Sequence, residues 1–241
     1  MSMPATHELT VKVEAASLAA LVDAGAGLYA FLGFQTSNRT AVPLVFVAQP
    51  QLAASMPVAW AEDYRGFVSQ TLLPDGVGAP GKRTIEIAST SAARLGDALT
   101  LSGTLGLDAA SGGTPGALTF RSGQPATVTC GLSYGGGDFT PACAATLNPG
   151  IDVVLAPLQV AFVMLSSSQF QAGAWVSASA GNGLRVDMTA ADARIVTFDM
   201  KAPGGWVESG QAWAQPVPAG TPLSNVLRQA PRPNVARMMR R

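Results

Sequence analysis

The sequence predicts an all-β protein, an antiparallel β-sandwich or a barrel-like fold with about ten to thirteen short strands, one or two short helices and an extended C-terminal arm. Three observations predict this class. Apolar and polar residues alternate with period two in many short segments. Turn-forming residues separate these segments, and the 241 residues include 26 Gly and 17 Pro. The apolar period of about 3.6 residues that marks an amphipathic helix is scarce.

The N-terminal part contains the first strand and the first helix. Every second residue is apolar at 9–14, as in a strand with one buried face. Residues 17–24 predict a helix of about two turns, because Ser17 can cap its start and Gly25 can end it. Further strands are expected at 28–36, 42–48, 57–64 and 83–89.

The remaining strands follow in the middle and C-terminal parts. Leucines at alternate positions of 99–107 predict one strand, with Gly103 in register among them. Residues 127–134 alternate in the same way. The longest apolar run, 153–165, is too short to cross a bilayer, so we expect one or two buried strands within 151–165. Other strands are expected at 117–121, 172–179, 184–188 and 195–200, and a second short helix at 224–229.

Charge is sparse and unevenly distributed. Fifteen Lys and Arg balance fifteen Asp and Glu, and charged residues make up 12% of the chain, against about 25% in an ordinary soluble domain. Residues 209–241 contain five arginines and no acidic residue, so residues 1–208 carry a formal charge of −5. We therefore expect a β-sandwich body at 1–208 and an extended Pro/Arg-rich arm at 209–241. The arginines of this arm are the expected subunit contacts: Arg228, Arg232, Arg237, Arg240 and Arg241.

Two catalytic motifs occur without the context that they need. Residues 131–135 match the G-x-S-x-G nucleophile elbow, but the single histidine, His7, precedes them, so Ser133 is expected to be an ordinary hydroxyl at a strand end. Residues 76–83 match most of a phosphate-binding loop. There Arg83 replaces the hydroxyl that ligates magnesium, and a strand pattern follows instead of a helix.

The residue types that enzymes and metal sites use are few. With one His and two Cys, we expect no catalytic site, no metal and no cofactor, and His7 is expected to be exposed. An enzyme would have to rely on Asp, Glu or Ser without a nearby His. Cross-strand ion pairs are expected among Arg185, Arg194, Asp187, Asp192 and Asp199.

Two interpretations are open for the cysteines, and two for the large aromatic residues. Cys130 and Cys143 can form one disulfide or remain two buried thiols. The aromatic residues either pack in the core or contact a ligand or a neighbouring subunit. The aromatic residues in question are Trp60, Tyr64, Phe67, Trp206 and Trp213.

These features favour a non-enzymatic structural protein that assembles with copies of itself, such as a subunit of a phage or virion component, a tube, a fibre or a lattice. Neutral Ser, Thr and Gly surfaces can be buried between subunits at less desolvation cost than charged ones. Other structural proteins of the same assembly are further candidate partners. Nucleic acid is not expected, because the arginines of the arm have no aromatic residue among them for base stacking.

The alternative is a β-sandwich module that binds carbohydrate or lipid, or a pore-forming toxin, in which the aromatic cluster would contact sugar or membrane. The N-terminal residues lack the cationic and apolar regions of a secretory signal. Synthesis in the cytoplasm is therefore expected, with incorporation into a virion or a released particle as a further expectation.

Overall fold

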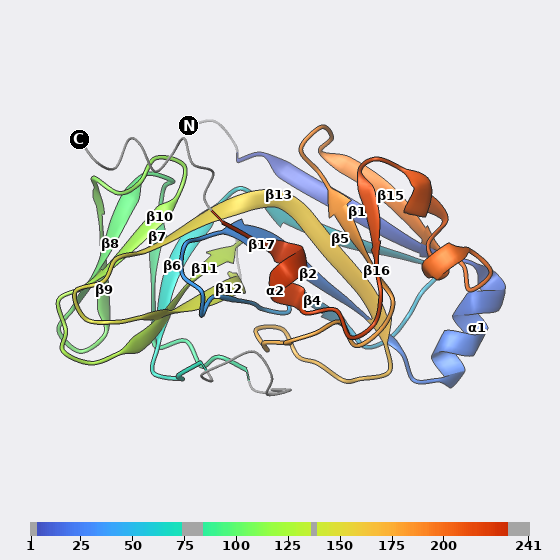
Figure 1. Ribbon diagram of the computed structural model, residues 1–241, viewed down its shortest axis with the longest axis horizontal. Coiled ribbons are helices and arrows are strands. Elements are labelled where there is room, and N and C mark those ends of the chain that lie inside the picture. The colour runs from blue at the N-terminus through green and yellow to red at the C-terminus, as the bar shows by residue number, and fades with distance from the viewer. Residues whose placement is uncertain (1–3, 74–83, 136–138, 231–241) are drawn as a thin grey trace.

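The computed structural model describes residues 4–73, 84–135 and 139–230 (Figure 1). These residues form an all-β protein, which confirms the predicted fold class. The strands are β1 (Thr6–Val13), β2 (Gly27–Gln35), β3 (Val42–Pro43), β4 (Val47–Gln49), β5 (Ser55–Ala61), β6 (Tyr64–Ser69), β7 (Ser89–Ala93), β8 (Asp97–Ser102), β9 (Gly106–Ser111), β10 (Leu118–Ser122), β11 (Val128–Tyr134), β12 (Thr140–Leu147), β13 (Val153–Ser166), β14 (Gly183–Asp187), β15 (Ala193–Phe198), β16 (Ala214–Val217) and β17 (Arg228–Gln229). The helices are α1 (Ala15–Asp23), α2 (Leu223–Leu227) and the 3-10 turns η1 (Pro203–Gly205) and η2 (Val207–Gly210).

Both predicted helices are present, and none of the described helices is long and apolar enough to span a membrane. Strands are more numerous than predicted, since several consist of only two or three residues.

The strands form three sheets, and β13 lies within the largest of them. Their orders are β15-β1-β5, β3-β12-β11-β6-β7 and β16-β14-β13-β10-β8-β9, and β2 joins the largest sheet by pairing with β13. The first half of β13 pairs with β10 and the second half with β2 and β14, so this 14-residue strand runs through both lobes of the molecule (Figure 1). Most pairs are antiparallel, and the parallel pairs among the described strands are β1–β15, β8–β10 and β2–β17.

Alternation decides which face of β1 is buried. Leu9, Val11 and Val13 lie in the main core, whereas Glu8 and Lys12 on the opposite face are exposed. The period-two pattern at 9–14 therefore predicts this strand correctly.

Strand β2 is buried on both faces instead. Leu32 points into the main core, while Phe31 lies in a second core that includes Phe162 of β13 and Leu223 of α2. Apolar residues consequently run along β2 with little alternation, as expected of a strand covered on both sides.

The predicted continuous strand at 99–107 is wrong. The chain turns between β8 and β9, with Gly103 at φ +49° and Leu105 at φ +68°, so that Leu101 pairs with Leu107 across a hairpin. The leucines alternate in both arms, which hides the turn between them. Of the expected strand at 83–89, residues 85–88 are not in a strand, and 172–179 contributes only isolated bridges.

The described part of the predicted arm belongs to the body. Strand β16 pairs with β14, α2 packs on the second core and β17 pairs with β2. Residues 209–230 are therefore not an extension from a body that ends at residue 208. Four of the five arginines proposed as subunit contacts lie outside the described residues: Arg232, Arg237, Arg240 and Arg241.

Candidate functional site

A groove at the edge of the largest sheet is built around Arg185. In the register of the sheet, Arg185 of β14 lies between Phe162 of β13 and Gln215 of β16. Phe162 is fully buried, Arg185 is half-buried and Gln215 is exposed, so the row passes from the second core to solvent. The alternation of β14 directs Arg185 away from the main core, in which Leu184 and Val186 are buried.

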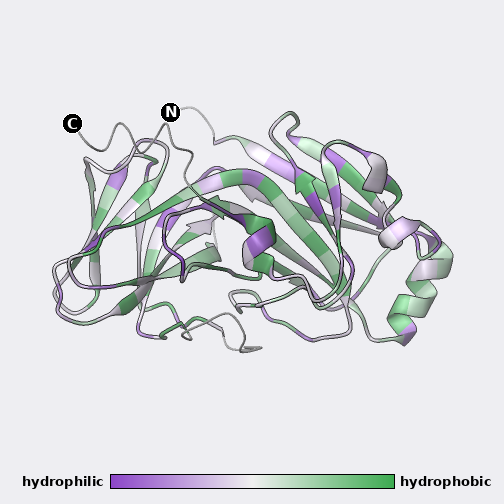
Figure 2. Ribbon diagram, in the orientation of Figure 1, coloured by the Kyte–Doolittle hydropathy of each residue, from purple (hydrophilic) through white to green (hydrophobic). Residues whose placement is uncertain are grey.

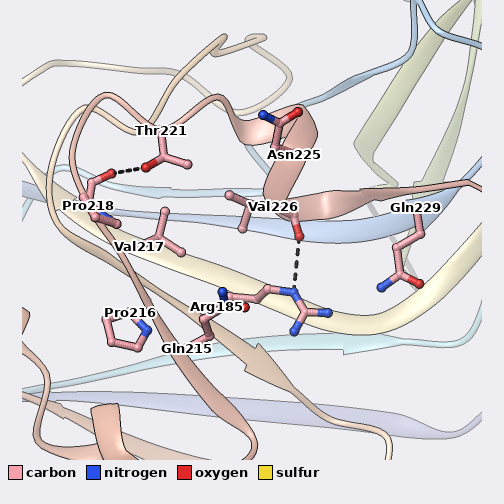
Figure 3. Close-up of a pocket in the computed structure, with 9 residues that line it drawn as sticks. All are labelled: Arg185, Gln215, Pro216, Val217, Pro218, Thr221, Asn225, Val226 and Gln229. Atoms are coloured by element: carbon pink, nitrogen blue, oxygen red, sulfur yellow. Dashed lines mark hydrogen bonds between the residues drawn. The ribbon is translucent and has the colours of Figure 1, made fainter.

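The last turn of α2 holds the guanidinium of Arg185. Its Nε donates a hydrogen bond to the carbonyl oxygen of Val226 at 3.2 Å. Carbonyl groups in the last turn of a helix have no partner within the helix, so this oxygen is free to accept. Figure 3 shows the guanidinium lying beneath the helix, with Gln229 to one side.

The groove has a volume of about 460 Å³, and the described residues that line it are neutral apart from Arg185. Its other lining residues are Gln215, Pro216, Val217, Pro218, Thr221, Asn225, Val226 and Gln229. The Thr221 hydroxyl donates to the carbonyl oxygen of Pro218 at 2.7 Å. The groove therefore combines one cation with three carboxamides, one hydroxyl and apolar side chains.

Arg185 has no acidic partner in the described part of the chain. The only ion pair there between a Lys or Arg and a carboxylate joins Arg121 to Asp152 at 3.2 Å. The pKa of the Asp187 carboxyl is lowered mainly by hydrogen bonds from Thr189, with a smaller contribution from the positive charges of Arg185 and Arg194. The ion pairs expected among Arg185, Arg194, Asp187, Asp192 and Asp199 are thus not formed.

His7 is buried rather than exposed, which corrects the expectation. Its ring stacks on Trp60 with centroids 5.4 Å apart, and its Nε2 lies 3.2 Å from Glu62 Oε1. Its Nδ1 lies 3.5 Å from the carboxylate of Asp192, and the Gln159 amide donates to the same Glu62 oxygen. The pairing of β1 with β5 brings His7 opposite Trp60, although the two residues are 53 positions apart in the chain.

Ser133 is not part of a nucleophile site with His7. It is fully buried within β11, and its Oγ has no hydrogen-bond partner. The matching G-x-S-x-G pattern is therefore a strand, as the sequence indicates. The pattern at 76–83 that resembles a phosphate-binding loop lies outside the described residues.

The large aromatic residues mostly pack in the core. Trp60, Tyr64, Phe67 and Trp206 are buried, so the single chain does not present them to a ligand. Trp213 is half-buried beneath the guanidinium of Arg194, which lies 4.3 Å from the centre of its ring. An exposed cluster that could contact sugar or membrane is thus not formed by these residues.

Both cysteines are buried free thiols, so of the two alternatives the disulfide is not formed. Cys130 lies opposite Ala145, and Cys143 opposite Leu132, on the paired strands β11 and β12. Burial raises the pKa of both thiols, that of Cys143 to about 12. Neither thiol is a nucleophile at neutral pH.

The outward face of α1 is apolar, which is unusual for a helix at the surface. Ala16, Ala19 and Ala20 are exposed on one side, and Val22 is 53% exposed. Beside the helix, Met200 is 60% exposed, and its backbone N–H donates to the Ser17 hydroxyl at 2.9 Å. We call Ala16, Ala19, Ala20 and Val22 of α1, together with Met200, the α1 face.

Helix α1 lies at one end of the molecule (Figure 1), and Figure 2 colours most of it from white to green, on the hydrophobic side of the scale. Asp23 is its single charged residue. The sequence predicts the helix but not its exposure; the apolar side chains that pack it against the core are Leu18 and Leu21, and both are only partly buried.

Arg228 is the one proposed arm contact that the structure describes. It is half-buried in β17, and its guanidinium donates to the backbone carbonyl of Arg39 in the same chain.

Comparison with protein-family models, curated proteins and solved structures gave no match.

Proposed function

We propose that the protein is a non-enzymatic structural protein that assembles with further copies of itself, as a subunit of a phage or virion component, a tube, a fibre or a lattice. The observation that carries the proposal is the α1 face. Charged residues normally cover the outer side of a surface helix, and here alanines and Val22 take their place. Small side chains also let another backbone approach closely, which suits a helix buried against a neighbouring subunit.

The distribution of charge supports the same proposal. Among the described residues one Arg–carboxylate pair forms within the chain, so most cations and carboxylates remain available to another copy. Residues 1–208 carry −5 and residues 209–241 carry +5, which makes the two parts complementary between copies as well as within one.

Substitution on the α1 face tests the proposal. We expect the unaltered chain to form oligomers in size-exclusion chromatography with light scattering at high micromolar concentration. The double variant Ala16→Glu/Ala19→Glu should shift towards the 24.6 kDa monomer, because assembly would then bury two carboxylates. Glutamate is favourable in the first turn of a helix, so Ala16→Glu should not unfold α1.

A matched control places the same change elsewhere. Ala110 is exposed on β9, at the opposite end of the molecule from α1 (Figure 1), and Ala110→Glu should leave the oligomer intact. A monomeric unaltered chain would overturn the proposal. An oligomer that survives the double variant would exclude the α1 face as its contact.

A further inference from the structure

The groove around Arg185 has the composition of a ligand site. Its guanidinium is half-buried, held through Nε by the Val226 carbonyl, and lies among nine lining residues that include no carboxylate. The two terminal nitrogens of an arginine form a planar pair of donors that matches a carboxylate in bidentate geometry. The groove thus supplies a fixed cation, and none of the described residues of its walls is a carboxylate that could neutralise it.

The neutral polar residues of the groove narrow the class of ligand further. The carboxamides of Gln215, Asn225 and Gln229 each offer donors and an acceptor, and the Thr221 hydroxyl, already donating to Pro218, can only accept. A phosphate ion carries only one or two P–OH donors at neutral pH, fewer than the three amide oxygens of the lining. Hydroxyl groups both donate and accept, so the lining suits a polyhydroxylated molecule.

The remaining walls are apolar. Pro216, Pro218 and Val226 present aliphatic surface next to the polar groups, as a sugar ring with one C–H face requires (Figure 3). The volume of about 460 Å³ falls within the range of small-molecule sites. We infer that the Arg185 groove binds a carboxylate-bearing saccharide, with the guanidinium on the carboxylate of a uronic acid unit and the carboxamides on its hydroxyls.

This site is separate from the α1 face and uses none of the aromatic residues first considered for carbohydrate binding. Binding at this site therefore does not depend on whether the chain assembles. It also explains why an arginine occupies a row of the sheet whose inner positions are phenylalanines.

Titration calorimetry on the full chain tests the inference with tri-galacturonic acid as the probe. We expect binding that is lost with the neutral probe maltotriose, since only the acidic sugar offers a carboxylate. Arg185→Gln should weaken the binding by about tenfold or more, as loss of a charge-assisted hydrogen-bonded pair does. Arg121→Gln is the matched control, because Arg121 is an exposed arginine outside the groove.

Two further measurements separate loss of binding from loss of folding. Asn225 is exposed on α2, so Asn225→Ala should weaken binding while the melting temperature stays unchanged. Inorganic phosphate and triglutamate serve as competing probes for an anion site and an acidic-peptide site. No binding of tri-galacturonate at about 10 mM, or binding of either competitor as tight as that of the sugar, would overturn the inference.

Discussion

Gly131 lies where β11 passes between two neighbours that leave no room for a side chain. A Cβ at this position would overlap the ring of Phe67 and the backbone carbonyl oxygen of Cys143. The ring can shift a little, but the carbonyl is fixed by the pairing of β11 with β12. The glycine that begins the G-x-S-x-G pattern is thus required by packing.

We expect Gly131→Ala to lower the free energy of unfolding by about 1–3 kcal/mol, as overpacking of a core does. Ser133→Ala is the contrasting change. The Oγ of Ser133 is buried without a hydrogen-bond partner, so its removal should leave the free energy unchanged or raise it by up to about 1 kcal/mol. Urea unfolding of both variants measures this, and an equal loss in both would refute the packing argument.

The buried thiols make stability sensitive to high pH. The thiol of Cys143 ionises near pH 9 in the unfolded chain, whereas burial raises its native pKa to about 12. The unfolded state therefore binds fewer protons than the native state between these values. The contribution of this thiol is complete below pH 9 and is lost as pH rises towards 12.

Urea unfolding between pH 8 and about 10.5 checks this expectation. The free energy of unfolding should fall with pH, with about 1.4 kcal/mol per pH unit contributed by each such thiol above its unfolded pKa. Cys143→Ala should make the fall shallower than in the unaltered chain. The same slope in both proteins would contradict the assignment.

His7 shows why single residues are hard to place from sequence. Near the N-terminus it has the local signature of an exposed residue, yet pairing of β1 with β5 brings Trp60 and Glu62 against it. The Arg185 groove has no local sequence signal for the same reason. Gln215, Asn225 and Gln229 line one groove with Arg185 only because β16 pairs with β14 and α2 lies beside them.

At the scale of elements, the sequence predicts those whose signals are local. The sequence predicts α1 because an apolar stretch at residues 17–24 is followed by a glycine, and the helix spans Ala15–Asp23. Strand β12 was not predicted, since it consists largely of small residues and is buried through its pairing with β11. Strand β16 contains Pro216, which is compatible with its place at the edge of the sheet.

The C-terminal elements should be indispensable up to residue 230. Leu223 and Leu227 of α2 are buried against the second core, so a chain that ends at residue 208 would expose the face that holds Phe31 and Phe162. We expect the 1–208 chain not to fold, whereas the full chain should melt in one cooperative transition. Circular dichroism melts distinguish these results.

A point substitution tests the same packing without truncation. Leu223→Ala should lower the free energy of unfolding by about 2–5 kcal/mol, whereas exposed Asn225 on the same helix should tolerate alanine. If Leu223→Ala were as stable as Asn225→Ala, α2 would contribute little to the fold.

The formal charge of the whole molecule is zero, but residues 1–208 are acidic and residues 209–241 are basic. The cations beyond residue 230, with Arg228, balance the excess of carboxylates on 1–208. A chain ending at residue 230 has eleven basic and fifteen acidic residues, a formal charge of −4. If the acidic part of one copy attracts the basic part of another, association should depend on the four arginines beyond residue 230 and on the salt concentration.

The four arginines beyond residue 230 can be neutralised without shortening the chain. Replacing the four arginines by glutamine keeps the length of the chain and gives the same charge of −4; the positions are Arg232, Arg237, Arg240 and Arg241. Light scattering should show smaller assemblies for this variant at low salt, because like-charged copies repel. In the full chain the assemblies should shrink as salt rises from about 0.05 to 0.5 M, since screening then acts within a few ångströms. Assemblies of equal size in both proteins, unchanged by salt, would show that contacts such as the α1 face act without help from charge.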